Sequence, residues 1–284
     1  MSPSTYHPAP TTSSRKRTRR SRRPHVLYLG DWVFHMGPTF VETPFNTVET
    51  KDCDLHFYGQ RLADALAPRA ELTCLSNWQL YRLKPGELEA LVRKSAAVIV
   101  SDVEAKCFQL YPDFFDRSKR TGHVETYPDR LQFLKDWVAG GGGMMMLGGW
   151  LSFSGAKEAG GWRRSRMADA LPVECLAGED VVESSAGFTA EVVKSSHPCV
   201  KGLPWDEFPP LFGYNELIAR PDSEVLVRIR ETGHPLLVAG GHGKGRVLCY
   251  GSDPVAHWGI NFELWAGYDR FWQRALRWVA RGRK

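Results

Sequence analysis

Short apolar segments alternate with helical segments through the first half of the chain, and this alternation is the feature that most constrains its fold. The segments between the apolar runs have helical spacing, most clearly after Asp129, where Leu131, Leu134 and Val138 recur. A strand, a helix and a further strand in this order form a crossover connection, which makes the two strands parallel. The sequence therefore predicts an α/β protein with a mainly parallel central sheet. The strand-length runs are residues 26–30, 71–76, 96–103 and 144–147.

The remaining segments give further local predictions. Residues 31–50 have no helical period and contain Gly-Pro and Thr-Pro steps, so we expect a loop there. Helices are expected at 57–66, 85–93 and 262–281, and residues 104–128 are expected to be irregular. Short strands are expected at 188–193, 224–230, 235–239 and 246–250, with a hairpin across the glycine-rich residues 240–245.

Basic residues are concentrated at the N-terminus. Residues 1–24 contain seven Lys and Arg and no Asp or Glu, so the net charge of +5 becomes −2 for the rest of the chain. The segment is also rich in Ser, Thr and Pro, which predicts a disordered tail. A nearly neutral remainder argues against nucleic-acid binding, except non-specifically through the tail. We therefore expect a basic tail at 1–24 and a single domain at 25–284.

The cysteines and the apolar runs indicate a compartment. None of the six cysteines forms a Cys-x-x-Cys pair, which fits a reducing environment. The apolar runs are much shorter than the roughly 20 residues that cross a bilayer, so no membrane association is expected. Arg22-Arg23 is followed by Pro24 and only a short apolar run, which does not fit an export signal. The predicted location is the cytoplasm.

A ligand pocket is expected where the parallel strands end, because open parallel sheets bind ligands beyond the carboxyl ends of their strands. The loops to consider are 31–35, 102–107, 148–155 and 252–259. Aromatic side chains near these loops indicate either a pocket wall or a protein interface. The candidate pocket residues on these grounds are Asp31, His35, Asp102, Gly148, Gly149, Trp150, Tyr214 and Trp258.

The glycine-rich residues 140–155 form the most specific local pattern. Glycines precede and follow a short strand, so the backbone can come close to whatever lies above the sheet. Neither a G-x-G-x-x-G phosphate loop nor a G-x-S-x-G nucleophile turn is present. A tight turn that requires small residues is the favoured interpretation, and no cofactor is predicted.

Several further motifs follow one another in a fixed order along the chain. They are Gly148-Gly-Trp-Leu-Ser-Phe-Ser-Gly155, Ser196-His-Pro198, Pro209-Pro-Leu-Phe-Gly-Tyr-Asn215, Gly243-Lys-Gly-Arg-Val247, Ser252-Asp253 and His257-Trp-Gly259. This ordered set resembles one family, the class I glutamine amidotransferase-like superfamily, and within it the branch of putative glutamine amidotransferases. The resemblance extends over about residues 25–281 and adds Asn215 to the candidate pocket residues. It implies a flavodoxin-like three-layer sandwich with a mainly parallel sheet.

The resemblance also implies an activity that the sequence supports poorly. Enzymes of this superfamily release ammonia from glutamine with a cysteine nucleophile that a histidine activates. Here Trp150 stands about where that cysteine would be, and no cysteine lies between 108 and 174. His257 matches the location of the catalytic histidine. If the protein is catalytic, Ser152 with His257 as base and Asp253 nearby is the preferred set, although Ser152 could instead hydrogen-bond its own turn.

Other interpretations remain open at this stage. Cys107 could replace the missing nucleophile, although an inert cysteine is favoured. Asp31 with His35, or Asp253 with His257, could hold a metal ion, although the spacing is common and no metal site is predicted. Lys244 and Arg246 could bind an anion or be ordinary surface charges of a hairpin.

Two functional hypotheses follow. The first is a divergent hydrolase or transferase that acts on a small polar molecule at Ser152, Asp253 and His257. The second is a non-catalytic ligand-binding or assembly protein on the same scaffold, a pseudoenzyme that has lost its nucleophile. Both hypotheses predict a small-molecule ligand as partner and leave a homo-oligomer open.

Overall fold

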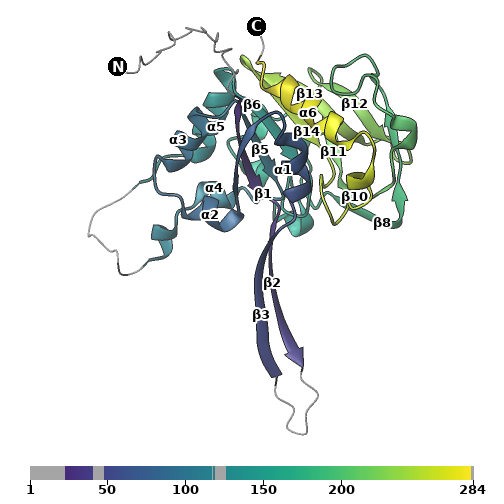
Figure 1. Ribbon diagram of the computed structural model, residues 1–284. Helices are drawn as coiled ribbons and strands as arrows, with labels where there is room; N and C mark the ends of the chain where they lie inside the picture. The colour runs from purple at the N-terminus through teal and green to yellow at the C-terminus, as the bar shows by residue number, and fades with distance from the viewer. Residues whose placement is uncertain (1–22, 41–47, 117, 119–125, 283–284) are drawn as a thin grey trace, which may run out of the picture.

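The computed structural model describes residues 23–40, 48–116, 118 and 126–282 (Figure 1). Of the predicted basic tail, residues 1–22 lie outside the described residues. No helix of the described chain is long and apolar enough to cross a membrane.

An eight-stranded sheet forms the centre of the molecule, in the order β4-β1-β5-β6-β14-β13-β12-β9. The first five strands pair in parallel, and the last three add to β14 in antiparallel fashion. The predicted α/β class with a mainly parallel central sheet is confirmed. The strands are β4 (Glu71–Leu75), β1 (His25–Gly30), β5 (Ala97–Ser101), β6 (Gly143–Leu147), β14 (Gly245–Tyr250), β13 (Pro235–His242), β12 (Glu224–Ile229) and β9 (Ala190–Val192).

Helices cover both faces of this sheet because its strands are apolar on both sides. Within β1, Val26 and Tyr28 join one buried cluster with α1 (Gln60–Leu66) and α6 (Tyr268–Val279). The alternate residues Leu27 and Leu29 join a second cluster on the opposite face. The helices on that side are α2 (Asn77–Arg82), α3 (Glu87–Arg93), α4 (Lys106–Gln109) and α5 (Arg130–Ala139).

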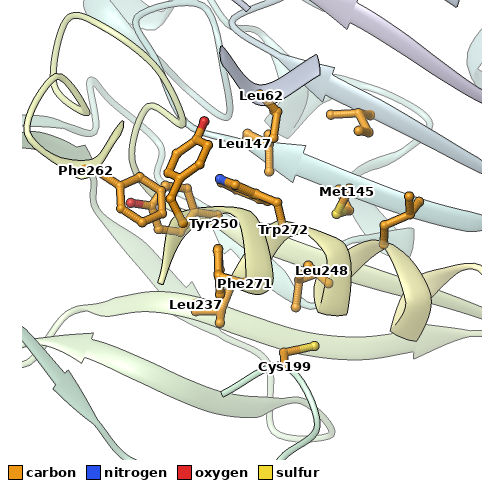
Figure 2. Packing of buried hydrophobic residues seen from close by; sticks show 14 of the residues in the cluster. Leu62, Met145, Leu147, Cys199, Leu237, Leu248, Tyr250, Phe262, Phe271 and Trp272 are labelled. Carbon is orange, nitrogen blue, oxygen red and sulfur yellow. The ribbon is translucent and has the colours of Figure 1, made fainter. Parts of the chain in front are cut away.

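The first cluster is dominated by large aromatic side chains. Figure 2 shows Phe271 and Trp272 of α6 beside Tyr250 and Phe262, with Leu147 and Met145 of the sheet behind them. All of these side chains are almost completely buried. The amphipathic C-terminal helix is confirmed, but it begins at Tyr268, and a 3₁₀ turn at Phe262–Leu264 precedes it.

The prediction of a loop at 31–50 is wrong for the described residues of that range, and its residues 41–47 lie outside them. The structure places there β2 (Trp32–Phe40) and β3 (Val48–Phe57), an antiparallel pair that extends away from the body (Figure 1). The register shifts at Gly37 and Pro38, where the missing N–H of proline is tolerated. Because β3 runs to Phe57, the following helix begins at Gln60 instead of 57.

The second half contains two additional short sheets that the sequence did not predict. They pair β10 (Leu211–Asn215) with β8 (Val181–Phe188), and β11 (Leu217–Ala219) with β7 (Val173–Cys175). The expected hairpin across 240–245 is confirmed as the β13–β14 connection. Further 3₁₀ turns lie at Pro112–Phe115, Ala156–Glu158, Trp162–Arg164, Ala168–Ala170 and Trp205–Glu207.

Candidate functional site

A cavity of about 280 Å³ lies beyond the carboxyl ends of the parallel strands. Asp31 directly follows β1, Asp102 follows β5, Trp150 follows β6, and Asp253 and His257 follow β14. Adjacent parallel strands end at the same edge of the sheet, which is why residues distant in sequence meet here. The cavity is lined by Asp31, Val33, Tyr58, Asp102, Trp150, Asp253, Val255, Ala256 and His257.

His257 is the side chain with the most directed contacts in this pocket. Its Nδ1 lies 2.7 Å from Oδ2 of Asp253, and its Nε2 lies 3.9 Å from Oε1 of Glu183. The Trp150 ring meets the imidazole edge-on at 4.3 Å, and the Trp258 ring stacks against it at 5.1 Å. Burial lowers the pKa of His257, so the neutral imidazole, which can accept a proton, predominates at neutral pH.

Three carboxyl groups face the pocket from three strand ends. Burial raises the pKa of Asp31 and of Asp253 well above the ordinary range, and it also raises the pKa of Asp102. The neighbouring carboxyls add to the shifts of Asp31 and Asp253, since like charges in a buried site cannot all ionise together. Burial therefore favours protonated carboxyl groups at Asp31 and Asp102 beside a neutral imidazole, whose Nδ1 is placed to donate its proton to a hydrogen bond with the Asp253 carboxylate.

The backbone is strained at three residues of the same pocket. Asp31, Asp102 and His257 have φ angles of 54°, 51° and 99°, in a region that residues other than glycine seldom adopt. Residues held in this way cost about 1–3 kcal/mol each and cluster at functional sites. The coincidence with the pocket lining identifies this cavity as the candidate functional site.

The glycine-rich turn after β6 forms one wall of the pocket. Gly149 has a φ of 140°, and a Cβ atom there would lie 2.5 Å from Oδ1 of Asp102, so glycine is required. The same Asp102 oxygen accepts a hydrogen bond of 2.7 Å from the Leu151 N–H. The favoured interpretation of a tight turn agrees with this geometry.

Asn215 lies behind the turn, away from the pocket lining. Its side-chain oxygen accepts a hydrogen bond from the Gly149 N–H, and its amide donates to the Gly149 carbonyl and to the Asp180 carboxylate. Asp180 in turn accepts from the N–H groups of Ser154 and Gly155. Asn215 therefore positions the turn instead of contacting a ligand.

Ser152 does not line the pocket. Its hydroxyl is completely buried, donates to the Leu147 carbonyl at 2.6 Å and accepts from the Asp102 N–H at 3.0 Å. The geometry thus matches the alternative in which Ser152 hydrogen-bonds its own turn. It offers no support for Ser152 as a nucleophile activated by His257.

The other candidate residues have mixed placements. Tyr214 is buried at a different place, where its hydroxyl contacts Thr232 and His234. Gly148 is buried under the turn. The Trp258 ring is buried behind the pocket surface, where it stacks against His257 and donates a hydrogen bond from Nε1 to Glu183. His35 lies in β2, and its side chain is outside the described residues.

The cysteines whose side chains are described have no activated thiol among them. Burial, with a smaller contribution from the nearby Glu104 carboxyl, raises the pKa of Cys107 to about 12. Burial likewise raises the pKa of Cys74, Cys175, Cys199 and Cys249. A nucleophilic cysteine needs the opposite shift. Among the described side chains, no group of three or more His, Cys, Asp and Glu has the arrangement of a metal site.

Two residues of the site were not predicted. Glu183 lies on β8 and accepts hydrogen bonds from Nε1 of both Trp150 and Trp258, which lowers its pKa. Tyr58, which follows β3, lines the cavity. No local pattern in the sequence identifies either one, because Glu183 lies on one strand pair that the sequence did not predict and Tyr58 directly follows another.

The fold and the site define an α/β protein with a polar pocket at the carboxyl edge of its sheet. A family model described as putative glutamine amidotransferase (GATase1-like) matches residues 44–281. The chain belongs to this family, as the sequence motifs predicted.

Two solved structures are similar over nearly their whole length. Cytoplasmic protein STM3548 from Salmonella typhimurium is 28% identical, with a TM-score of 0.79 over 91% of this chain and 99% of that chain. Cytoplasmic protein STM1381 from Salmonella typhimurium LT2 is 30% identical, with a TM-score of 0.75 over 90% of this chain and 99% of that chain. No curated protein matches the chain.

The raised pKa of Asp31 predicts a pH-dependent gain in stability for Asp31→Asn. The unfolded chain ionises Asp31 near pH 4, whereas the folded chain keeps it protonated. Its contribution to stability is therefore complete below that pH and is lost as the pH rises through the folded pKa. The asparagine variant has no such loss and can still accept the Tyr28 hydrogen bond. We expect it to exceed the wild type by on the order of 1 kcal/mol or more at pH 8 and to match it near pH 4.

Urea denaturation of both proteins at the two pH values measures this difference. Asp222→Asn, which removes an exposed carboxyl, is the matched control. It should change the free energy of unfolding by the same small amount at both pH values. A difference between Asp31→Asn and wild type that does not grow with pH would contradict the assigned protonation.

Proposed function

We propose that this chain is a divergent hydrolase or transferase of the glutamine amidotransferase-like family that acts on a small polar substrate by general acid–base catalysis. The observation that carries the proposal is the contact of 2.7 Å between His257 and Asp253, in a pocket that also holds Asp31 and Asp102. Pairs of titratable groups with displaced pKa values are typical of acid–base sites.

His257 is the proposed base. Asp253 fixes the orientation of the imidazole through Nδ1, which leaves Nε2 to accept a proton from an attacking water or alcohol. The new C–O bond forms at the carbonyl carbon of a substrate amide and the C–N bond breaks, while a protonated carboxyl of Asp31 or Asp102 donates its proton to the departing nitrogen, which leaves as ammonia or an amine. Water takes the place of the missing cysteine, so no covalent intermediate on the protein is needed.

The same pocket restricts the substrate. Protonated carboxyls donate hydrogen bonds, and Trp150 and Tyr58 offer apolar surface beside them. A cavity of about 280 Å³ accommodates a molecule of a few non-hydrogen atoms or part of a larger one. A small amide or related carbonyl compound fits both properties.

A second candidate function is a non-catalytic ligand-binding or assembly protein. It is favoured by one observation, the lack of an activated nucleophile among the described side chains, since Ser152 is hydrogen-bonded to backbone and the pKa of Cys107 is raised. In this case His257 and the carboxyls would bind a ligand without turning it over.

Ammonia release separates the two candidates. Purified wild type is incubated with glutamine and a panel of small amides, beside His257→Ala and Cys107→Ser. The proposal expects release from at least one amide, lost in His257→Ala and retained in Cys107→Ser. Loss in Cys107→Ser alone would indicate a cysteine enzyme after all. No release from any amide, with all three proteins folded, would leave the binding function.

Four further features are proposed on other grounds. The helices on both faces of the sheet support a flavodoxin-like three-layer sandwich, and the shared sheet supports a single domain over 25–284. The free cysteines and the two cytoplasmic relatives support a cytoplasmic location. The long β2–β3 hairpin would suit a homo-oligomer, which size-exclusion chromatography with light scattering would detect.

A further inference from the structure

A second cavity, of about 580 Å³, lies at the opposite edge of the sheet from the His257 pocket. Arg246 stands at the amino end of β14, paired with Gly143 at the start of β6. Arg274 and Arg277 come from the last turns of α6, and Arg281 follows the helix. Pro198, Trp278 and Gly282 complete the lining.

The positive charges of the four arginines lining this cavity are not neutralised by nearby carboxylates. No carboxylate lines the cavity, and none of the four forms an ion pair within the described part of the chain. A solvated basic helix face would be convex and would carry acids among the bases. Here four like charges from three elements face one concave space, an arrangement that an anion would stabilise.

Two of the guanidinium groups are held in place. Arg246 donates a hydrogen bond of 2.9 Å to the Trp278 carbonyl and lies 5.0 Å from the centre of the Trp278 ring. Arg274 donates to the Lys201 carbonyl. Because each guanidinium carries five N–H donors, these contacts leave donors free for a ligand. A preorganised site loses less conformational entropy when it binds.

We propose that this arginine cavity binds the phosphate group of a small soluble molecule. The paired N–H donors of arginine match the oxygens of phosphate and of carboxylate alike, and the four positive charges of this cavity favour a multiply charged phosphate over a single carboxylate. The volume lies within the range of small-molecule sites. The net charge of −2 outside the N-terminal tail argues against the extended basic surface that a nucleic acid requires. On this proposal Arg246 belongs to an anion-binding site, which is the first of the two interpretations that the sequence left open, and is not an ordinary surface charge of the hairpin.

Calorimetric titration with pyrophosphate and with inorganic phosphate, at fixed ionic strength, tests the proposal. The full chain is compared with the double variant Arg277→Gln/Arg281→Gln and with the control Arg163→Gln/Arg270→Gln. The control removes the same charge from exposed positions outside the cavity, one of them on α6. All three proteins keep the basic tail, so its contribution is the same in each.

The expected result is saturable binding of pyrophosphate at one site per chain. Its Kd rises about tenfold or more in the cavity variant, since each charged hydrogen bond is worth at least that factor, and changes less than about twofold in the control. Equal weakening in both double variants, or no saturable binding, would overturn the proposal. Tighter binding of a short DNA duplex, or of phosphatidylglycerol vesicles, than of pyrophosphate would also overturn it.

Discussion

Replacing Asp253 with asparagine should lower kcat by about 10²–10⁴-fold on the amide that the panel identifies, with little change in KM. The asparagine side chain has nearly the same shape, so the pocket keeps its form. Its NH₂ group, however, can donate to Nδ1 of His257, which favours the proton on Nε2. The imidazole then presents an N–H to the substrate where the reaction needs a base.

Two readouts separate this effect from a structural one. In Asp253→Asn, the NMR signals of the His257 ring nitrogens should show that the proton has moved from Nδ1 to Nε2. The free energy of unfolding of the variant at pH 7 should not fall, because a buried carboxyl has been removed. Asp206→Asn, at an exposed position, is the control and should change neither. If kcat in Asp253→Asn stays within a few-fold of wild type, the pair does not act as proposed.

The sequence predicted the central sheet because its strands have a clear physical signature. Strands buried on both faces have continuous apolar runs, as at 26–29 and 96–100, and helices with apolar stripes connect them. The β2–β3 hairpin has neither property. It extends away from the body, periodicity did not identify it, and the Gly-Pro and Thr-Pro steps within residues 31–50 indicated a loop.

The placement of the site residues follows the same logic. Asp31, Asp102, Trp150, Asp253 and His257 could be found because each follows a predicted strand, and topology brings these ends together. Whether a residue of a turn faces the ligand or the interior is decided by hydrogen bonds inside the turn, which a sequence does not show. Ser152 and Asn215 were therefore assigned to the pocket although both point away from it.

Replacing Asn215 with alanine should reduce the free energy of unfolding by roughly 3 kcal/mol or more, because it leaves several buried polar groups without partners. The change removes both hydrogen bonds to Gly149 and the one to Asp180. Burial raises the pKa of the Asp180 carboxyl, and the hydrogen bond from the Asn215 amide offsets part of this rise. Loss of the Asn215 amide therefore disfavours the ionised Asp180 carboxylate, which accepts hydrogen bonds from the N–H groups of Ser154 and Gly155.

The same substitution should reach the pocket through the turn. Gly149 lies between Asp102 and Asn215 and is hydrogen-bonded to the latter. When the Asn215 side chain is removed, we expect the turn to loosen and the next residue, Trp150, to lose its contact with the His257 ring. Urea denaturation measures the loss of stability, and the part of the tryptophan fluorescence quenching that a Trp150→Phe substitution removes reports the loosened turn. Asn261→Ala, which removes an exposed amide on the Pro210 carbonyl, should cost less than about 1 kcal/mol. Equal losses in the two variants would mean that the turn is held by its own backbone and that Asn215 does not position the site.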